Sequence, residues 1–143
     1  MRLLWSLILA PAGLATTALA DPLELALECR GETSHVVFRR GGAVTDSFKH
    51  DPNIYLSGEN AIITWKPGGA KEGRVIATPQ KFFLVLPDPP LGRGARLVSK
   101  EASIDRVTGV FTDVTEVENG RQRERVEHTS TCEQMSDPGQ RKF

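Results

Sequence analysis

The sequence predicts an all-β fold, a small antiparallel barrel or sandwich of about eight to ten short strands held by one disulfide. Three observations favour this class. Apolar and polar residues alternate with a period of two in several short segments. Turn signals rich in glycine, proline and asparagine recur about every ten residues. No long stretch after Asp21 shows the 3.6-residue apolar period that is typical of a helix.

Length and charge exclude several classes of protein. The chain has 143 residues, of which 39% are hydrophobic and 25% charged, and its formal net charge is zero. This length predicts one domain. The balanced charge argues against a nucleic-acid partner, because proteins that bind nucleic acid normally carry a basic excess. The composition is also too apolar for a disordered chain.

Residues 1–20 have the features of a secretory signal peptide. Arg2 precedes a short apolar run, and small residues lead to an A-x-A ending at Ala20. An uncleaved membrane anchor is the alternative, but Pro11 interrupts a run that is already short for a membrane span. Cleavage would leave residues 21–143 as a single all-β domain without a membrane span. We therefore expect a periplasmic or secreted protein.

The only cysteines, Cys29 and Cys132, lie near opposite ends of the exported chain. An even cysteine count in an exported protein favours a disulfide. A metal site is the alternative, but neither cysteine has a C-x-x-C partner. A reactive thiol would leave the other cysteine unexplained. We therefore expect one bridge that joins the first strand to the last.

The first strand follows from strict alternation. Leu23, Leu25, Leu27 and Cys29 alternate with mostly polar residues, so a half-buried strand is expected to end where Gly31 and Glu32 break the pattern. The strands expected after it cover residues 35–40, 44–48, 54–57, 61–66, 74–78, 82–86, 96–107, 109–117 and 122–132.

Turn signals separate these strands. A tight hairpin is expected at residues 40–43, a break at 51–53, further turns at 58–59 and 79–80, and a polar loop at 67–73. The longest irregular connection is expected at 87–94, where three prolines and two glycines exclude regular structure.

Asn119-Gly120 is the strongest turn signal and predicts a two-residue type I′ loop. The register that follows places Asp113 opposite Val126 on the presumed core side, so a bulge or another register stays open. The other opposing pairs expected are Glu118–Arg121, Glu116–Arg123, Phe111–His128 and Val107–Cys132.

The sequence assigns no catalytic residue, metal ligand or cofactor. His35, His50 and His128 stand in no recognisable motif, and no nucleophile, P-loop or dinucleotide-binding signature is present. A hydrolase with a dispersed site that uses His128 or His50 stays open, because catalytic groups can assemble from distant parts of a chain.

Two loops are candidate binding elements. Trp65 and Lys66 precede a glycine-containing loop that leads to Lys71. An aromatic side chain beside a basic loop is typical of a loop that binds a partner. Trp65 could instead be a core side chain. The irregular segment near Arg93 and Arg96 is the second candidate.

Arg121, Arg123 and Arg125 share one strand face. They could bind an anionic partner, or Glu116 and Glu118 could neutralise them from the neighbouring strand.

Several short segments carry a resemblance to known proteins. They are Leu27-Glu28-Cys29, Ser103 to Gly109, Thr131-Cys132-Glu133 and Arg141-Lys142-Phe143. In these segments the sequence resembles uncharacterised small exported β-proteins of proteobacteria. In architecture it is also similar to the periplasmic inhibitors of C-type lysozyme, small barrels that block the enzyme cleft with loops. Their recognition segments occur here in reversed order, with Trp65-Lys66 before Gly94-Ala95-Arg96, so their inhibitory residues are not carried over.

These observations favour an exported binding or inhibitor-like module. Its partner would be a protein or cell-envelope ligand that contacts the loops. A small hydrolase and an accessory subunit of an envelope complex are the alternatives.

Overall fold

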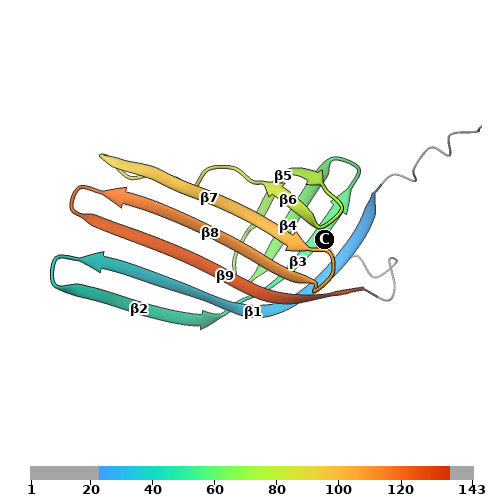
Figure 1. The fold of residues 1–143 in the computed structure, drawn as a ribbon, viewed down its shortest axis with the longest axis horizontal. Coiled ribbons are helices and arrows are strands. Elements are labelled where there is room, and N and C mark those ends of the chain that lie inside the picture. The colour runs from blue at the N-terminus through green and yellow to red at the C-terminus, as the bar shows by residue number, and fades with distance from the viewer. Residues whose placement is uncertain (1–22, 136–143) are drawn as a thin grey trace, which may run out of the picture.

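The all-β class is confirmed. A computed structural model describes residues 23–135, and these form nine antiparallel strands in one continuous sheet (Figure 1). The expected signal peptide, residues 1–20, lies outside the described residues. None of the described residues forms a helix that could cross a membrane. The strands are β1 (Glu24–Arg39), β2 (Gly42–Lys49), β3 (Asp51–Ser57), β4 (Asn60–Lys66), β5 (Ala70–Ala77), β6 (Lys81–Val85), β7 (Ala95–Asp105), β8 (Val110–Asn119) and β9 (Gln122–Gln134).

The sheet closes on itself through its first and last strands. The strand order is β2-β1-β3-β4-β5-β6-β7-β8-β9, and β1 also pairs with β9. Eight strands therefore form a closed antiparallel barrel, and β2 is an additional strand paired with the second half of β1. Closure gives the barrel strands partners on both sides and leaves few free edges.

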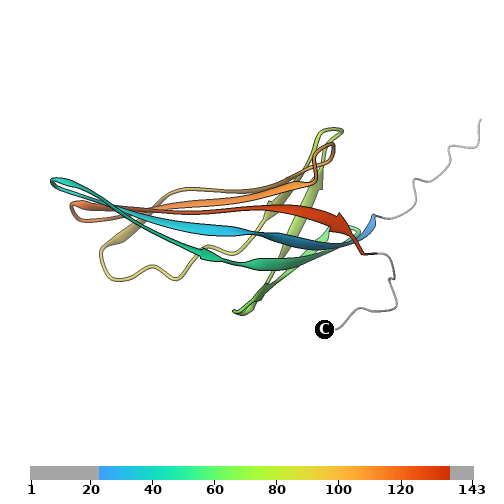
Figure 2. The same ribbon diagram turned by 90° about the horizontal axis from the view of Figure 1, so that it is seen from below.

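Four barrel strands continue beyond the barrel and, together with β2, form a single-layered sheet (Figures 1 and 2). The order in this sheet is β2-β1-β9-β8-β7, and β3 to β6 do not reach this far. We call this open part the wing; it comprises residues 33–39, 42–49, 95–100, 114–119 and 122–127. Its inner face is the continuation of the barrel interior.

The core fills the barrel, and each of the eight barrel strands contributes to it. Strand alternation places one row of apolar side chains of each strand inside. The buried cluster consists of Leu27, Cys29, Ile54, Leu56, Ala61, Ile63, Val75, Phe82, Leu84, Leu86, Ala102, Ile104, Phe111 and Cys132.

The expected disulfide is confirmed. Cys29 and Cys132 are directly opposite each other on β1 and β9, and their sulfur atoms are bonded. The bridge therefore joins the two strands whose pairing closes the barrel.

The expected end of the first strand at Gly31 is wrong, because β1 continues through this residue to Arg39. The part of β1 before Gly31 pairs with β3, and the part after it pairs with β2. A Cβ atom at this position would lie 2.1 Å from the carbonyl oxygen of Thr129. The glycine thus permits a close approach of β9 rather than a turn. Its backbone is held by Asp51 Oδ1, which accepts from the Gly31 N–H at 3.2 Å, and by the His50 N–H, which donates to the Gly31 carbonyl at 3.1 Å.

The expected register of the last hairpin is also wrong. Asn119 pairs with Gln122, so the two loop residues are Gly120 and Arg121. Gly120 has a φ of 61°, and Arg121 does not have a positive φ. This pattern matches a type II′ turn, which places glycine first, rather than the type I′ turn predicted. The pairing shifts by two residues, which preserves each side chain's face but changes its partner.

Other connections differ in detail from the expectation. Pro52 lies inside β3, where it is buried opposite Trp65, rather than in a break. The loop expected at 67–73 is shorter, since β5 already begins at Ala70. The long irregular connection is confirmed between β6 and β7. Lys100 fixes its start by donating to the Leu86 carbonyl and pairing with Asp88 at 2.6 Å.

Candidate functional site

A cavity of about 270 Å³ lies where the inner face of the wing meets the barrel. Phe48 in its wall is 49% exposed, so the cavity is open to solvent. Strands β1, β2, β4, β5, β8 and β9 and the 67–69 loop all contribute to it. The lining residues are Thr33, Phe48, His50, Trp65, Gly68, Gly69, Lys71, Asp113, Thr115, Val126 and His128.

Strand pairing places four of these side chains in one row. Phe48 pairs with Thr33, Thr33 with His128, and His128 with Asp113. Directly paired residues of antiparallel strands point to the same face. The register therefore brings residues from β2, β1, β9 and β8 together at the cavity, although they are far apart in the sequence.

A chain of hydrogen bonds runs along the cavity wall. Thr33 Oγ1 lies 2.9 Å from His128 Nδ1 and 3.3 Å from His50 Nδ1. His50 Nε2 lies 2.7 Å from the carbonyl oxygen of Pro67. The chain thus links β9, through β1, to the loop that follows Trp65.

Aromatic rings surround His128. Its ring centroid lies 4.8 Å from that of Trp65 and 5.5 Å from that of Phe111. The His50 ring in turn lies 4.6 Å from Trp65. Trp65 packs against the core and also lines the cavity, and its role in binding stays a prediction.

Two polar atoms of residues that line the cavity are themselves buried and have no hydrogen-bond partner among residues 23–135. They are Trp65 Nε1 and His128 Nε2. Buried polar groups in folded proteins are nearly always paired, so an unpaired one calls for a physical explanation.

Burial favours the neutral forms of both titratable groups in the row. Burial lowers the pKa of His128 to about 4, the charge on His50 adds to this effect, and Asp51 opposes it. Burial also raises the pKa of Asp113, against the opposing influence of Lys71 and Lys100. At neutral pH the His128 imidazole is therefore uncharged.

The structure brings together some of the residues singled out in the sequence and separates others. Trp65 and Lys71 line the cavity, and the exposed Lys66 adjoins it in β4. Arg93 is exposed in the long irregular connection, and Arg96 pairs with Glu118, so neither belongs to this cavity.

His50 and His128 meet at the cavity, whereas His35 pairs with Glu124 at 3.2 Å on the wing. Sequence reasoning missed Thr33 and Asp113 as members of the site. The alternation of its strand places Asp113 on the inner face, and this was a usable signal for the site. The predicted register, however, paired Asp113 with Val126 instead of His128.

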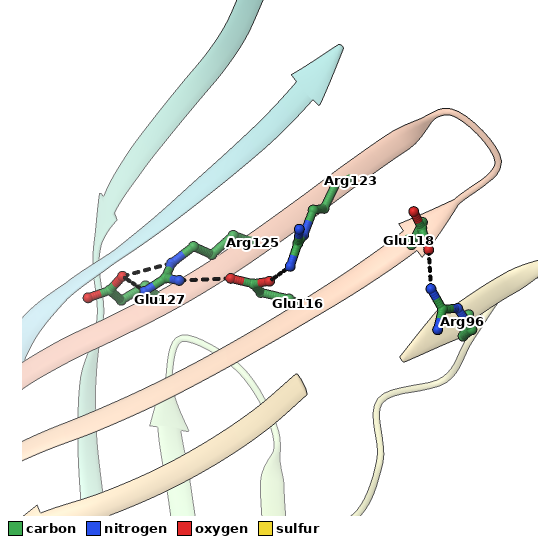
Figure 3. A network of polar contacts seen from close by, with 6 residues as sticks. All are labelled: Arg96, Glu116, Glu118, Arg123, Arg125 and Glu127. Atoms are coloured by element: carbon green, nitrogen blue, oxygen red, sulfur yellow. Dashed lines mark hydrogen bonds and ion pairs between the residues drawn. The ribbon is translucent and has the colours of Figure 1, made fainter. Parts of the chain in front are cut away.

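The outer face of the wing carries a network of ion pairs (Figure 3). Arg125 bridges Glu116 and Glu127, with both contacts at 2.8 Å, and Arg123 also binds Glu116. These hydrogen bonds, from Arg123 first and then Arg125, lower the pKa of Glu116. Of the two interpretations of this strand face, neutralisation by carboxylates therefore holds for Arg123 and Arg125.

Unpaired arginines gather instead at the tips of two neighbouring hairpins. Arg39 and Arg40 at the β1–β2 tip and Arg121 at the β8–β9 tip line one shallow hollow. None of the three forms an ion pair within the described part of the chain. Phe38, 43% exposed, lies among them.

The side chains of the described residues do not indicate a metal centre. Within residues 23–135, no three histidine, cysteine, aspartate or glutamate side chains are grouped so that they could hold a metal ion. No family model, curated protein or solved structure matches the chain significantly.

Proposed function

We propose that the protein is an exported, non-enzymatic binding module that accepts a group of a protein or cell-envelope ligand in this cavity. The observation that carries the proposal is the solvent-open cavity, whose wall combines aromatic rings with hydroxyl, imidazole, ammonium and carboxyl groups. Concave sites that place a few polar groups among apolar and aromatic side chains are typical of ligand binding.

The size of the cavity limits what it holds. Its volume of about 270 Å³ is at the small end of ligand sites, which typically span about 300–1,000 Å³. One ring or one side chain would fill it, and the rest of a larger ligand would lie outside. The inner face of the wing offers apolar contacts beside it, since Val126 and Val44 are 40% and 54% exposed.

Tryptophan fluorescence provides a direct test. The chain has two tryptophans, Trp5 and Trp65, and the exported protein expected after cleavage at Ala20 keeps only Trp65 as a reporter. Envelope proteins, envelope glycans and small aromatic amides would be titrated into this protein. A saturable change in emission that is lost in His128→Phe supports the proposal. No saturable change with any of these probes, together with no capture of an envelope component, overturns it.

One arrangement favours hydrolysis as a second candidate. The Thr33 hydroxyl lies within hydrogen-bond distance of two imidazoles, as a nucleophile beside a general base would. Turnover of ester, phosphate or glycoside substrates that is lost in Thr33→Val and retained in Thr33→Ser would replace the binding proposal with a catalytic one.

We also propose that the hairpin tips contact an anionic lipid surface. Arginine side chains around an exposed apolar residue, as around Phe38, suit a layer of anionic headgroups over acyl chains. The contact would lie at the end of the wing that is farthest from the barrel (Figure 1).

Vesicle sedimentation tests the lipid contact. The protein should bind vesicles with anionic lipid, and added salt should weaken this binding. Replacing Arg39, Arg40 and Arg121 with glutamine should abolish it. The matched control replaces Arg30, Arg74 and Arg125 with glutamine and so removes the same number of charges. These arginines already pair with carboxylates of Glu28, Glu59, Glu116 and Glu127. Equal binding to neutral and anionic vesicles, or equal loss in both variants, would rule the contact out.

A further inference from the structure

Two side chains of opposite charge point into the end of the barrel that opens onto the wing. Lys71 on β5 pairs with Ile63. Asp113 on β8 pairs with Ala102 on one side and with His128 on the other. These three partners are buried, and directly paired residues of antiparallel strands point to the same face. Lys71 and Asp113 therefore both point inward, and both line the open cavity.

The protein leaves these two charges unpaired. Within residues 23–135, Lys71 and Asp113 form no hydrogen bond or ion pair, either with each other or with another side chain. Lys71 is exposed. Asp113 is half-buried, but its carboxyl oxygens are not among the buried unpartnered atoms of this region, so a ligand in the cavity can reach them.

The two charges influence each other across the cavity without contact. Burial raises the pKa of Asp113, and Lys71 and Lys100 oppose this rise. Lys100 already binds the Leu86 carbonyl and Asp88, so its ammonium is occupied. The strands β6 and β7 separate β5 from β8 in the sheet. A group that lies between Lys71 and Asp113 would therefore connect two different walls of the barrel.

We propose that the cavity binds a zwitterionic group, whose ammonium pairs with Asp113 and whose carboxylate or phosphate pairs with Lys71. This assignment rests on the proposed binding function. Asp113 would repel a ligand that is only an anion, and Lys71 would repel one that is only a cation. A neutral ligand would leave both charges of the site without a partner. A zwitterion supplies a charge-assisted hydrogen bond to each of them.

The rest of the cavity suits a small zwitterion that carries an apolar substituent. Phe48 and Val126, which are 49% and 40% exposed, offer apolar contacts in the same wall. Thr115 follows Asp113 by two residues on the same strand face and adds a hydroxyl. The volume of about 270 Å³ limits the ligand to a group the size of an amino acid or a lipid headgroup. An α-amino acid and an ethanolamine phosphate share the required chemistry, since each carries an ammonium and an anion a few bonds apart.

Two series of probes test the assignment and distinguish these sources. Chemical shifts of the Gly68 and Gly69 amides, which lie at the cavity, would be followed by ¹H–¹⁵N nuclear magnetic resonance in the full chain at pH 7. L-Phenylalanine is compared with phenethylamine and 3-phenylpropionate, which each keep only one of its charges. O-Phosphoethanolamine is compared with ethanolamine and methyl phosphate in the same way. In at least one series the zwitterion should bind about tenfold or more tightly than its counterparts, because each of these leaves one charge of the site unpaired.

Two variants should change the selectivity in opposite directions. Asp113→Asn should bind 3-phenylpropionate more tightly than the unsubstituted protein does, by about threefold or more, and should lose the preference for phenylalanine over this anion. Lys71→Met should do the same for phenethylamine. Lys66→Met is the matched control, because the exposed Lys66 adjoins the cavity without lining it, and it should keep the order of the unsubstituted protein. A gain of affinity for one probe cannot result from a loss of folding.

Two outcomes would overturn the assignment in distinguishable ways. Equal or tighter binding of single-charge probes in both series would overturn the zwitterion and leave the proposed binding function standing. Absence of saturable shifts with all six probes would also overturn it. The proposed function would fail as well only if the envelope proteins, glycans and aromatic amides of the fluorescence test do not bind either.

Discussion

Asp113 and His128 lie directly opposite each other on β8 and β9, and both side chains line the same cavity. A carboxyl group and an imidazole on directly paired residues would ordinarily suggest an ion pair. Here burial raises the pKa of the acid and lowers the pKa of the base, so it favours the uncharged form of each. The pair therefore makes the stability of the fold depend on pH in a defined way.

His128 should make the protein sensitive to mild acid. Its pKa is about 4 in the folded chain and about 6.5 in an unfolded one. Between these values the unfolded chain binds more protons, so stability is complete above about pH 6.5 and falls as the pH drops towards 4. The full loss is about 3 kcal/mol. Urea unfolding at a series of pH values would measure it.

Two variants isolate this contribution. His128→Gln, which cannot be protonated, should lose the acid-dependent part of the stability between pH 6.5 and 4. His35→Gln should keep it, because His35 lies on the wing and is half-exposed. The same pH profile in His128→Gln and the unsubstituted protein would show that another group is responsible.

Asp113→Asn should stabilise the protein at neutral pH. The folded chain raises the pKa of this carboxyl, so its charged form is disfavoured wherever the unfolded chain is ionised, above about pH 4. Removing the charge should therefore increase the free energy of unfolding at pH 7 by on the order of 1 kcal/mol. Asp46→Asn, at an exposed position of β2, should change it by no more than about 0.5 kcal/mol. A less stable Asp113→Asn protein would indicate that the carboxylate has a stabilising partner.

Removal of the disulfide should destabilise the barrel strongly. The cysteines are 103 positions apart, and closing a loop of this size contributes up to about 4.7 kcal/mol by restricting the unfolded chain. The double Cys29→Ala and Cys132→Ala variant should therefore unfold at much lower urea concentration. Reductant should shift the unsubstituted protein in the same direction and leave the variant unchanged. Equal unfolding midpoints with and without reductant would contradict this role.

Gly31→Ala should disturb the junction between the barrel and the wing. The added Cβ would lie 2.1 Å from the Thr129 carbonyl oxygen, and backbone on both strands would have to shift. A cost of about 1–3 kcal/mol or more is expected in thermal or urea unfolding. Gly92→Ala is the matched control, since nothing lies within 4 Å of the added atom. Similar stability of both variants would show that β9 can move away without cost.

The fold class was predictable because it depends on local signals, and the disulfide was predictable because two cysteines allow only one pairing within the chain. Alternation fixes which side chains face inward, and turn residues fix where most strands end. The interruption expected at Gly31 shows the limit of such signals. A glycine is needed there because β9 approaches closely at Thr129, almost a hundred residues further along the chain. Only the tertiary structure shows this approach.

The site was less predictable for a similar reason. The two-residue loop moved by one position, from Asn119-Gly120 to Gly120-Arg121, and every pairing in the hairpin moved with it. Trp65 and Lys71 were found because they are near each other in the sequence. Thr33 has no distinguishing local pattern, and its role depends on two imidazoles brought to it by β9 and by the connection after β2.

The continuity of β1 links the two parts of the molecule mechanically. The strand is a wall of the barrel up to Gly31 and an inner strand of the wing beyond it, and β9 pairs with it from Leu27 to Phe38. A pull on the hairpin tips would therefore be transmitted along two parallel paths to the covalent bond between Cys29 and Cys132. Thr33 and His128, each four positions from a bridged cysteine, lie on these two paths, so tension on the wing would pass through the wall of the cavity.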